Sequence, residues 1–116
     1  MSEYTPDAWV IIKIQTPTDK MYKVLAGWYG SYSGATSWGL SSGITKVKLI
    51  GDVYHIENES GSVYHCHKDV ERFTGMTADI FNQLVKKYGN SESHNIEHVK
   101  MKDYLKHLSK GKVARK

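Results

Sequence analysis

The segment ITKVKLIGDVYHIENESGSVYHCH, residues 44–67, decides the fold of this chain. It contains three runs of alternating apolar and polar residues separated by two turn sequences, a pattern typical of an antiparallel β-meander. Gly51-Asp52 predicts a two-residue hairpin turn, since glycine supplies the positive φ that such a turn requires. Residues 58–62 predict a type I turn followed by a glycine bulge, with Asn58 opposite Ser62.

The two turns assign the register of the meander independently, and the two assignments agree. Because side chains alternate along a strand, a slip of one residue would exchange the two faces of the sheet. The face that we expect in the core carries Val47, Leu49, Tyr54, Ile56, Tyr64 and Cys66. The wetter face carries Lys46, Lys48, Val53, His55, Glu57, Val63, His65 and His67.

Two further strands precede the meander, and helical segments follow it. The β-branched, apolar run 9–16 and the alternating run 20–28 predict a hairpin. An apolar stripe at helical spacing predicts a helix over 77–88, with Thr77 as the N-cap and Gly89 as the stop. Residues 96–101 fit either an edge strand or the start of a helix, and residues 102–109 predict a short helix.

These elements predict a single α+β domain over residues 1–109 and a basic, flexible tail over 110–116. We expect a twisted antiparallel sheet of about five strands, covered by one main helix with a short second helix. An edge strand at 96–101 is one that a second copy of the chain could pair with, which makes a homo-oligomer one expectation.

Composition narrows the setting in which the protein works. The chain has 116 residues and a net charge of +4, which modestly favours anionic partners. Its single cysteine, Cys66, cannot form an internal disulfide. No apolar run is long enough to span a bilayer, and the first residues lack the pattern of a secretory signal. We therefore expect a cytoplasmic protein with no membrane partner.

Residues 24–43 are the first candidate site. This stretch holds five of the ten glycines. Because glycine loses more backbone entropy on folding than other residues, such a run lowers stability and is unfavourable in a purely structural role. Its aromatic side chains could stack on a base, and its glycines could let backbone N–H groups approach a phosphate. The alternative is that the aromatic residues complete the core. The candidate residues are Trp28, Tyr29, Gly30, Tyr32, Gly34, Trp38 and Gly39.

The wetter face of the meander is the second candidate site. Lys46, Lys48, His55 and His65 could supply positive charge to a phosphate or a nucleic acid. The imidazoles of His55, His65 and His67 with Glu57 could instead hold a metal ion, although neighbouring lysines disfavour a cation. A plain face, either solvated or covered by a helix, is the third interpretation.

Catalysis finds little support in the sequence. Cys66 is expected to face the core beside Tyr54, where a thiol is inert. No serine lies in a nucleophile elbow, and no pair of carboxylates is placed for acid–base chemistry. We therefore predict no catalytic residues, no metal and no cofactor.

Three runs carry a resemblance to a known group of proteins: YKVLAGW at 22–28, SWGLSSGIT at 37–45 and SGSVYHCHK at 60–68. Over residues 8–88 the chain resembles small accessory proteins of large T-even-type tailed bacteriophages. The resemblance assigns no activity. It implies expression in the cytosol of an infected bacterium and a role in host takeover or in countering host defence, which such proteins typically perform by binding.

Together these observations predict a non-enzymatic accessory protein that binds an anionic ligand, either a nucleotide or a nucleic acid. The glycine-rich segment and the basic sheet face would form the site. The first alternative is an inhibitor that binds a host protein through the same aromatic residues. The second is a small metal-dependent enzyme that uses the histidine face.

Overall fold

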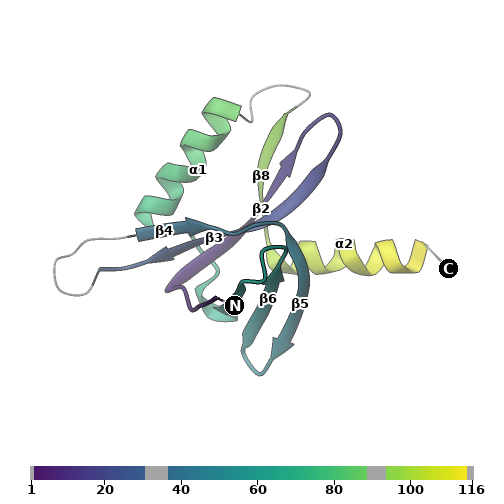
Figure 1. Ribbon diagram of the computed structural model, residues 1–116, viewed down its shortest axis with the longest axis horizontal. Helices are drawn as coiled ribbons and strands as arrows, with labels where there is room; N and C mark the ends of the chain where they lie inside the picture. Colours follow the sequence, from purple (N-terminus) through teal and green to yellow (C-terminus); the bar gives the residue numbers. More distant parts are fainter. Residues whose placement is uncertain (1, 31–36, 89–93, 115–116) are drawn as a thin grey trace.

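The computed structural model describes residues 2–30, 37–88 and 94–114. In this part of the chain, eight strands form two four-stranded sheets, accompanied by two α-helices and one short 3-10 helix (Figure 1). Sheet A has the order β1-β7-β6-β5 and contains β1 (Glu3–Tyr4), β5 (Ile44–Ile50), β6 (Val53–Asn58) and β7 (Val63–His67). Sheet B has the order β4-β3-β2-β8 and contains β2 (Ala8–Gln15), β3 (Lys20–Trp28), β4 (Ser37–Leu40) and β8 (Asn95–Val99). The helices are η1 (Lys68–Val70), α1 (Gly75–Tyr88) and α2 (Met101–Ala114).

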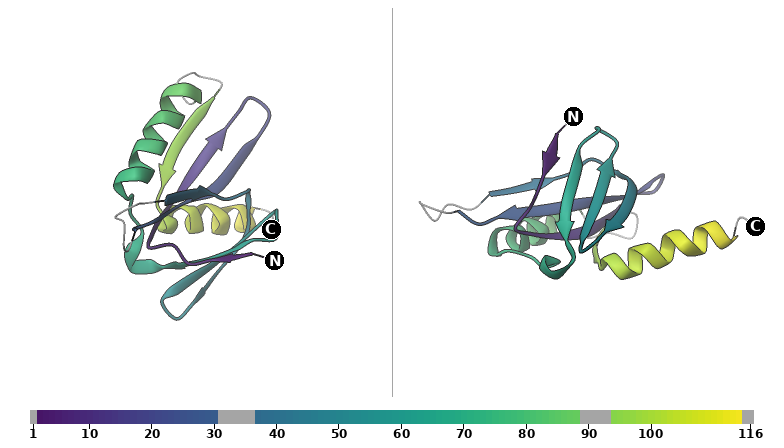
Figure 2. Two further views of the ribbon diagram at one scale, coloured as in Figure 1. Left: turned by 60° about the vertical axis from the view of Figure 1, so that its left-hand side comes forward. Right: turned by 90° about the horizontal axis from the view of Figure 1, so that it is seen from below.

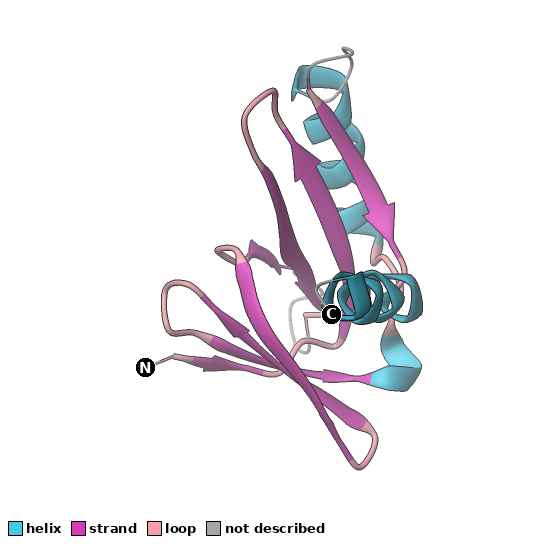
Figure 3. Cartoon of the chain, turned by 90° about the vertical axis from the view of Figure 1, so that its right-hand side faces the viewer, coloured by secondary structure: helices cyan, strands magenta, loops and turns pink. Residues whose placement is uncertain are grey.

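Strand β2 explains why the fold has two sheets. Its first five residues are almost completely buried, with Trp9 and Ile11 in one hydrophobic cluster and Val10 and Ile12 in another. Successive side chains of a strand point to opposite faces, so both faces of β2 must be covered. Sheet A covers one face and α1 covers the other (Figure 3). The α+β class is confirmed, whereas the expectation of one sheet of about five strands is wrong.

The chain passes between the two sheets three times: at two short corners, and from β7 to β8 through η1 and α1. One corner joins β1 in sheet A to β2 in sheet B, and the other, at residues 41–43, joins β4 in sheet B to β5 in sheet A. At the second corner, Ser41 is buried, and its hydroxyl accepts a hydrogen bond from the Val24 N–H (2.8 Å) and donates one to the Ser42 carbonyl (2.7 Å). These bonds satisfy backbone groups where the ladder is interrupted.

The predicted register of the meander is confirmed. Lys48 pairs with His55, and His55 pairs with His65. Gly51 and Gly61 have positive φ values of 62° and 90°, as their turns require. One residue of the expected core face differs: Leu49 is 54% exposed, because the tip of the β5–β6 hairpin extends past the opposing layer (Figure 3).

Helix α1 begins earlier than the sequence predicts. Thr74, not Thr77, is the N-cap: its hydroxyl accepts a hydrogen bond from the Thr77 N–H (3.0 Å), and the Thr77 hydroxyl accepts one from the Thr74 N–H (2.7 Å). This reciprocal pair resembles a capping box in which threonine replaces the usual glutamate. The expected stop at Gly89 lies outside the described residues. The predicted apolar stripe consists of Ile80, Phe81, Leu84, Val85 and Tyr88. Its first four residues pack against sheet B, whereas Tyr88 is exposed.

The ambiguous segment at 96–101 is a strand followed by a helix. Strand β8 pairs with β2 and forms an edge of sheet B. Helix α2 then begins at Met101, whose N–H donates to the Glu71 carboxylate (2.6 Å), and its Tyr104 packs against Tyr22 with ring centroids 4.8 Å apart. The helix runs to Ala114 rather than ending near Ser109, and its C-terminal end projects away from both sheets (Figure 2). Neither α-helix of the described residues is long and apolar enough to cross a membrane.

Gly27 permits the close approach of α1 to sheet B, and its substitution should destabilise the protein. A Cβ at this position would lie 2.7 Å from Thr74 Cγ2. We expect Gly27→Ala to lower the free energy of unfolding by about 1–3 kcal/mol, the usual cost of overpacking. Gly75→Ala is the matched control, because a Cβ there meets nothing within 4 Å and should stabilise the helix by up to about 1 kcal/mol. Urea denaturation measures both, and equal effects would contradict the packing argument.

His98 should make stability dependent on pH. The His98 side chain remains exposed to solvent, but partial burial lowers the pKa of its imidazole, which packs on Phe73 with ring centroids 5.0 Å apart. The unfolded chain therefore binds the proton more tightly, and stability is lost as the pH falls through the ordinary histidine pKa of about 6.5. Urea denaturation at about pH 7.5 and 5.5 should show a smaller loss for His98→Gln than for the wild type. If both lose the same amount, His98 is not the responsible group.

Candidate functional site

An exposed aromatic surface forms between Trp38 of β4 and the side of α1 that carries Ile80 to Tyr88. Trp38 is 43% exposed and Tyr88 is 56% exposed. They border a hollow of about 250 Å³, which we call the aromatic hollow. Lys87 Nζ lies 5.3 Å from the centroid of the Tyr88 ring. The remaining lining residues all come from α1 and are Ile80, Gln83 and Leu84.

Strand pairing explains the position of Trp38. It pairs with Gly27 across β3 and β4, and Gly27 faces the start of α1. Directly opposed residues of an antiparallel pair share a face, so Trp38 also points to the side on which α1 lies. The apolar stripe suggested that Tyr88 belongs to the core. The signal to the contrary is its place at the end of the helix, directly after Lys86 and Lys87.

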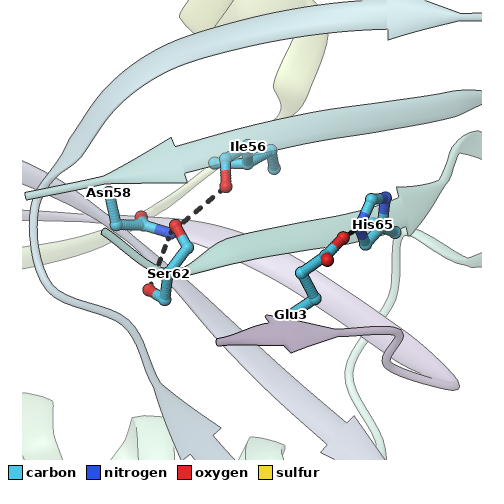
Figure 4. A network of polar contacts seen from close by, with 5 residues as sticks. All are labelled: Glu3, Ile56, Asn58, Ser62 and His65. Atoms are coloured by element: carbon cyan, nitrogen blue, oxygen red, sulfur yellow. Dashed lines mark hydrogen bonds and ion pairs between the residues drawn. The ribbon is translucent and has the colours of Figure 1, made fainter. Parts of the chain in front are cut away.

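The outer face of sheet A carries the histidines and lysines of the meander. We call this surface, with Lys46, Lys48, His55 and His65, the histidine–lysine face. His55 and His65 pack edge to face, with ring centroids 4.6 Å apart. His65 Nε2 lies 2.7 Å from Glu3 Oε1, a contact made by β1 and visible in Figure 4. A hollow of about 360 Å³ opens on this face, and its polar lining is Glu3, Lys48, His55, Glu57, Asn58 and His65.

Two carboxylates offset the two lysines on this face. Lys46 pairs directly with Glu57 on the neighbouring strand, and Glu3 occupies the other side. With neutral imidazoles, the four charged groups sum to zero, so the face attracts an anion less than the sequence suggested. The sequence predicts Glu57 on this face but offers no sign of Glu3, because a two-residue strand such as β1 has no periodic pattern to detect.

The structure does not bring the two predicted halves of the site together. The aromatic hollow lies on the outer side of sheet B and the histidine–lysine face on the outer side of sheet A, with the main core between them. A ligand stacked on Trp38 therefore finds its cation on α1 rather than on Lys46 or Lys48.

The other residues of the glycine-rich segment have mixed roles. Trp28 is half-buried against the core, and its Nε1 donates to the Thr5 carbonyl (3.0 Å). Gly39 lies beneath the Trp28 ring, since a Cβ there would be 3.6 Å from Cζ3. Tyr29 is 48% exposed, with its N–H bound to Asp7 Oδ2 (2.8 Å). Gly30 is half-buried at the end of the described segment, and Tyr32 and Gly34 lie outside the described residues.

Neither a metal site nor a reactive thiol is found among the described residues. In this part of the chain, no group of three or more His, Cys, Asp or Glu side chains could hold a metal ion. Cys66 is completely buried opposite Tyr54, as predicted, and burial raises the pKa of its thiol well above the usual range. The thiolate, which is the reactive form, is therefore scarce near neutral pH.

Comparison with known proteins identifies no relative: no protein-family model matches the chain, and no curated protein or solved structure is significantly similar to it.

The buried Cys66 thiol should resist modification in the native protein. We expect it to react with a disulfide reagent more slowly than the unfolded chain by at least about two orders of magnitude, the factor that about 2.8 kcal/mol of opening free energy imposes. Absorbance of the released thiol, with and without urea, measures the two rates. Rapid labelling without urea would show that Cys66 is accessible and would reopen a nucleophilic role.

Proposed function

We propose that this protein is a non-enzymatic binding protein that takes an anionic ligand with an unpaired base, a single-stranded nucleic acid or a nucleotide, in the aromatic hollow. The observation that carries the proposal is the exposure of Trp38 and Tyr88 beside Lys87 around one hollow. Aromatic stacking contributes about 1–3 kcal/mol per base in single-strand binding proteins. Exposed apolar side chains that gather in one patch mark interaction sites, and Trp38 and Tyr88 border the same hollow.

Charge and polarity at the aromatic hollow suit such a ligand. Lys87, in the last turn of α1, lines the hollow next to the aromatic rings and can contact a phosphate. Gln83 adds an amide that donates and accepts hydrogen bonds, as the edge of a base does. The hollow, about 250 Å³, is smaller than the usual pocket for drug-sized ligands, which fits one base better than a larger molecule.

The resemblance to accessory proteins of T-even-type bacteriophages is part of this proposal. It implies that binding takes place in the cytosol of an infected bacterium. In that setting, the ligand would be a nucleotide signal or an exposed strand of nucleic acid.

The competing function is inhibition of a host protein through the same aromatic residues. Tryptophan and tyrosine are enriched among the residues that dominate binding energy at protein interfaces. The dependence of affinity on salt concentration distinguishes the two functions. Affinity for a phosphate backbone falls steeply with salt because counterions are released, whereas an aromatic protein interface depends on salt far less.

Charge reversal at two lysines tests which surface binds the ligand. Lys87→Glu changes the aromatic hollow and Lys48→Glu changes the histidine–lysine face, while both alter the net charge equally. With a fluorescent deoxythymidine oligonucleotide, we expect Lys87→Glu to weaken binding by about tenfold or more and Lys48→Glu by about threefold or less. Fluorescence anisotropy at several salt concentrations measures this. Equal losses would show that only net charge matters.

Trp38→Ala tests the stacking contribution. Losing about 1.4 kcal/mol of stacking should weaken binding about tenfold. Because Trp38 is exposed, the variant should keep the far-UV circular dichroism spectrum of the wild type. Unfolding of the variant would instead assign Trp38 to the core. Absence of oligonucleotide and nucleotide binding by the wild type at low salt would favour the protein inhibitor.

A further inference from the structure

A second hollow, separate from the aromatic hollow, is formed by three segments that are far apart in the sequence. They are the N-terminal strand with Ser2 and Tyr4, the corner from Leu40 to Ser42, and the β6–β7 turn with its flanking Tyr64. The hollow measures about 340 Å³, and we call it the serine hollow; its hydroxyl-bearing serines are Ser2, Ser41, Ser42, Ser60 and Ser62. It shares no described lining residue with the aromatic hollow or with the hollow on the histidine–lysine face.

Hydrogen bonds arrange three of these hydroxyls in a row. Ser42 Oγ donates to Ser60 Oγ (3.0 Å) and accepts from the Ser60 N–H (3.0 Å), and Ser60 Oγ lies 3.1 Å from Ser62 Oγ. The Asn58 amide holds the far end, since it donates to the Ser62 carbonyl (3.1 Å) and the Ile56 carbonyl (3.2 Å) (Figure 4). Ser42, Ser60 and Ser62 have three hydroxyl protons in total, and the two bonds between their oxygens use two of them. One O–H therefore remains to donate to a ligand.

The charge around the serine hollow argues against an anion. None of the described residues that line it is charged. The neighbouring Glu59 carboxylate covers Gly43, where a Cβ would lie 3.0 Å from Glu59 Oε1. A phosphate placed here would meet no cation and a nearby like charge, which is unfavourable.

One wall of the serine hollow is aromatic. Tyr4 stacks on Tyr64 with ring centroids 4.9 Å apart, and Leu40 adds an aliphatic surface. Tyr4 is 40% exposed, so part of this wall remains open to solvent. The lining is mainly polar with a smaller apolar part, which suits a compact ligand with several groups that both donate and accept hydrogen bonds.

We propose that the serine hollow binds a neutral, hydroxyl-rich ligand, a saccharide ring. Sugar hydroxyls match the serine hydroxyls in donating and accepting, and the C–H face of the ring can lie against the tyrosine wall. This site is independent of the proposed nucleic-acid site, because it uses other residues and no charge.

Titration with methyl α-D-glucopyranoside tests the proposal, with glucose 6-phosphate as the charged counterpart. We expect the neutral sugar to shift the ¹H–¹⁵N signals of residues 41–42 and 60–62 saturably within about 50 mM, well above a Kd of about 1 mM. Ser60→Ala should weaken this binding by about three- to tenfold, the effect of one lost hydrogen bond. Ser37→Ala, an exposed serine outside the hollow, should bind as the wild type does.

A second variant keeps the test decisive if Ser60→Ala impairs folding. Ser2→Ala retains the backbone carbonyl that accepts from the Val63 N–H, and its exposed side chain can be shortened without disturbing the core. It should also weaken sugar binding. The proposal is overturned if the neutral sugar causes no saturable shift, if both hollow variants bind as tightly as the control, or if glucose 6-phosphate binds more tightly than the neutral sugar.

Discussion

Burial of β2 on both faces is the constraint on which the rest of the structure depends. Residues 8–12 are at most 1% exposed, and each large apolar side chain buried in this way contributes about 1.5–3 kcal/mol. Trp9 anchors the strand further, because its indole Nε1 donates to the His67 carbonyl at the end of β7 (2.8 Å). A strand of this kind needs a covering layer on each side. Sheet A and α1 provide those layers.

The passage of the chain between the sheets determines where binding surfaces can form. At the 41–43 corner, Ser41 satisfies backbone groups, and the serines that follow meet the β6–β7 turn. At the other corner, β1 carries Glu3 to His65 and Tyr4 to Tyr64. Both hollows of sheet A therefore depend on segments that switch sheets. The aromatic hollow instead depends on the contact between β4 and α1 on the far side of the core.

Whether nearby carboxylates offset the lysines decides which surfaces of this protein can attract an anion. Lysines stand out in the sequence of the meander, yet Glu3 and Glu57 share their face. At the end of α1, by contrast, Lys87 lies beside the exposed Tyr88 ring, at the helix terminus where cations are favoured. Hence the cation most useful to a stacked ligand comes from the helix and not from the sheet.

The sequence by itself determined the local structure: the register of the meander, both glycine turns, the apolar stripe of α1 and the burial of Cys66. Each follows from a period or a turn requirement that acts over a few residues. Only the tertiary structure decided the number of sheets, the β1–β7 pairing and the partners of Trp38, His65 and Ser60. These features join residues distant in sequence, for which a single chain carries no local signal. A continuous apolar run such as 9–12 shows that a strand is buried, but the layers that bury it are chosen by packing.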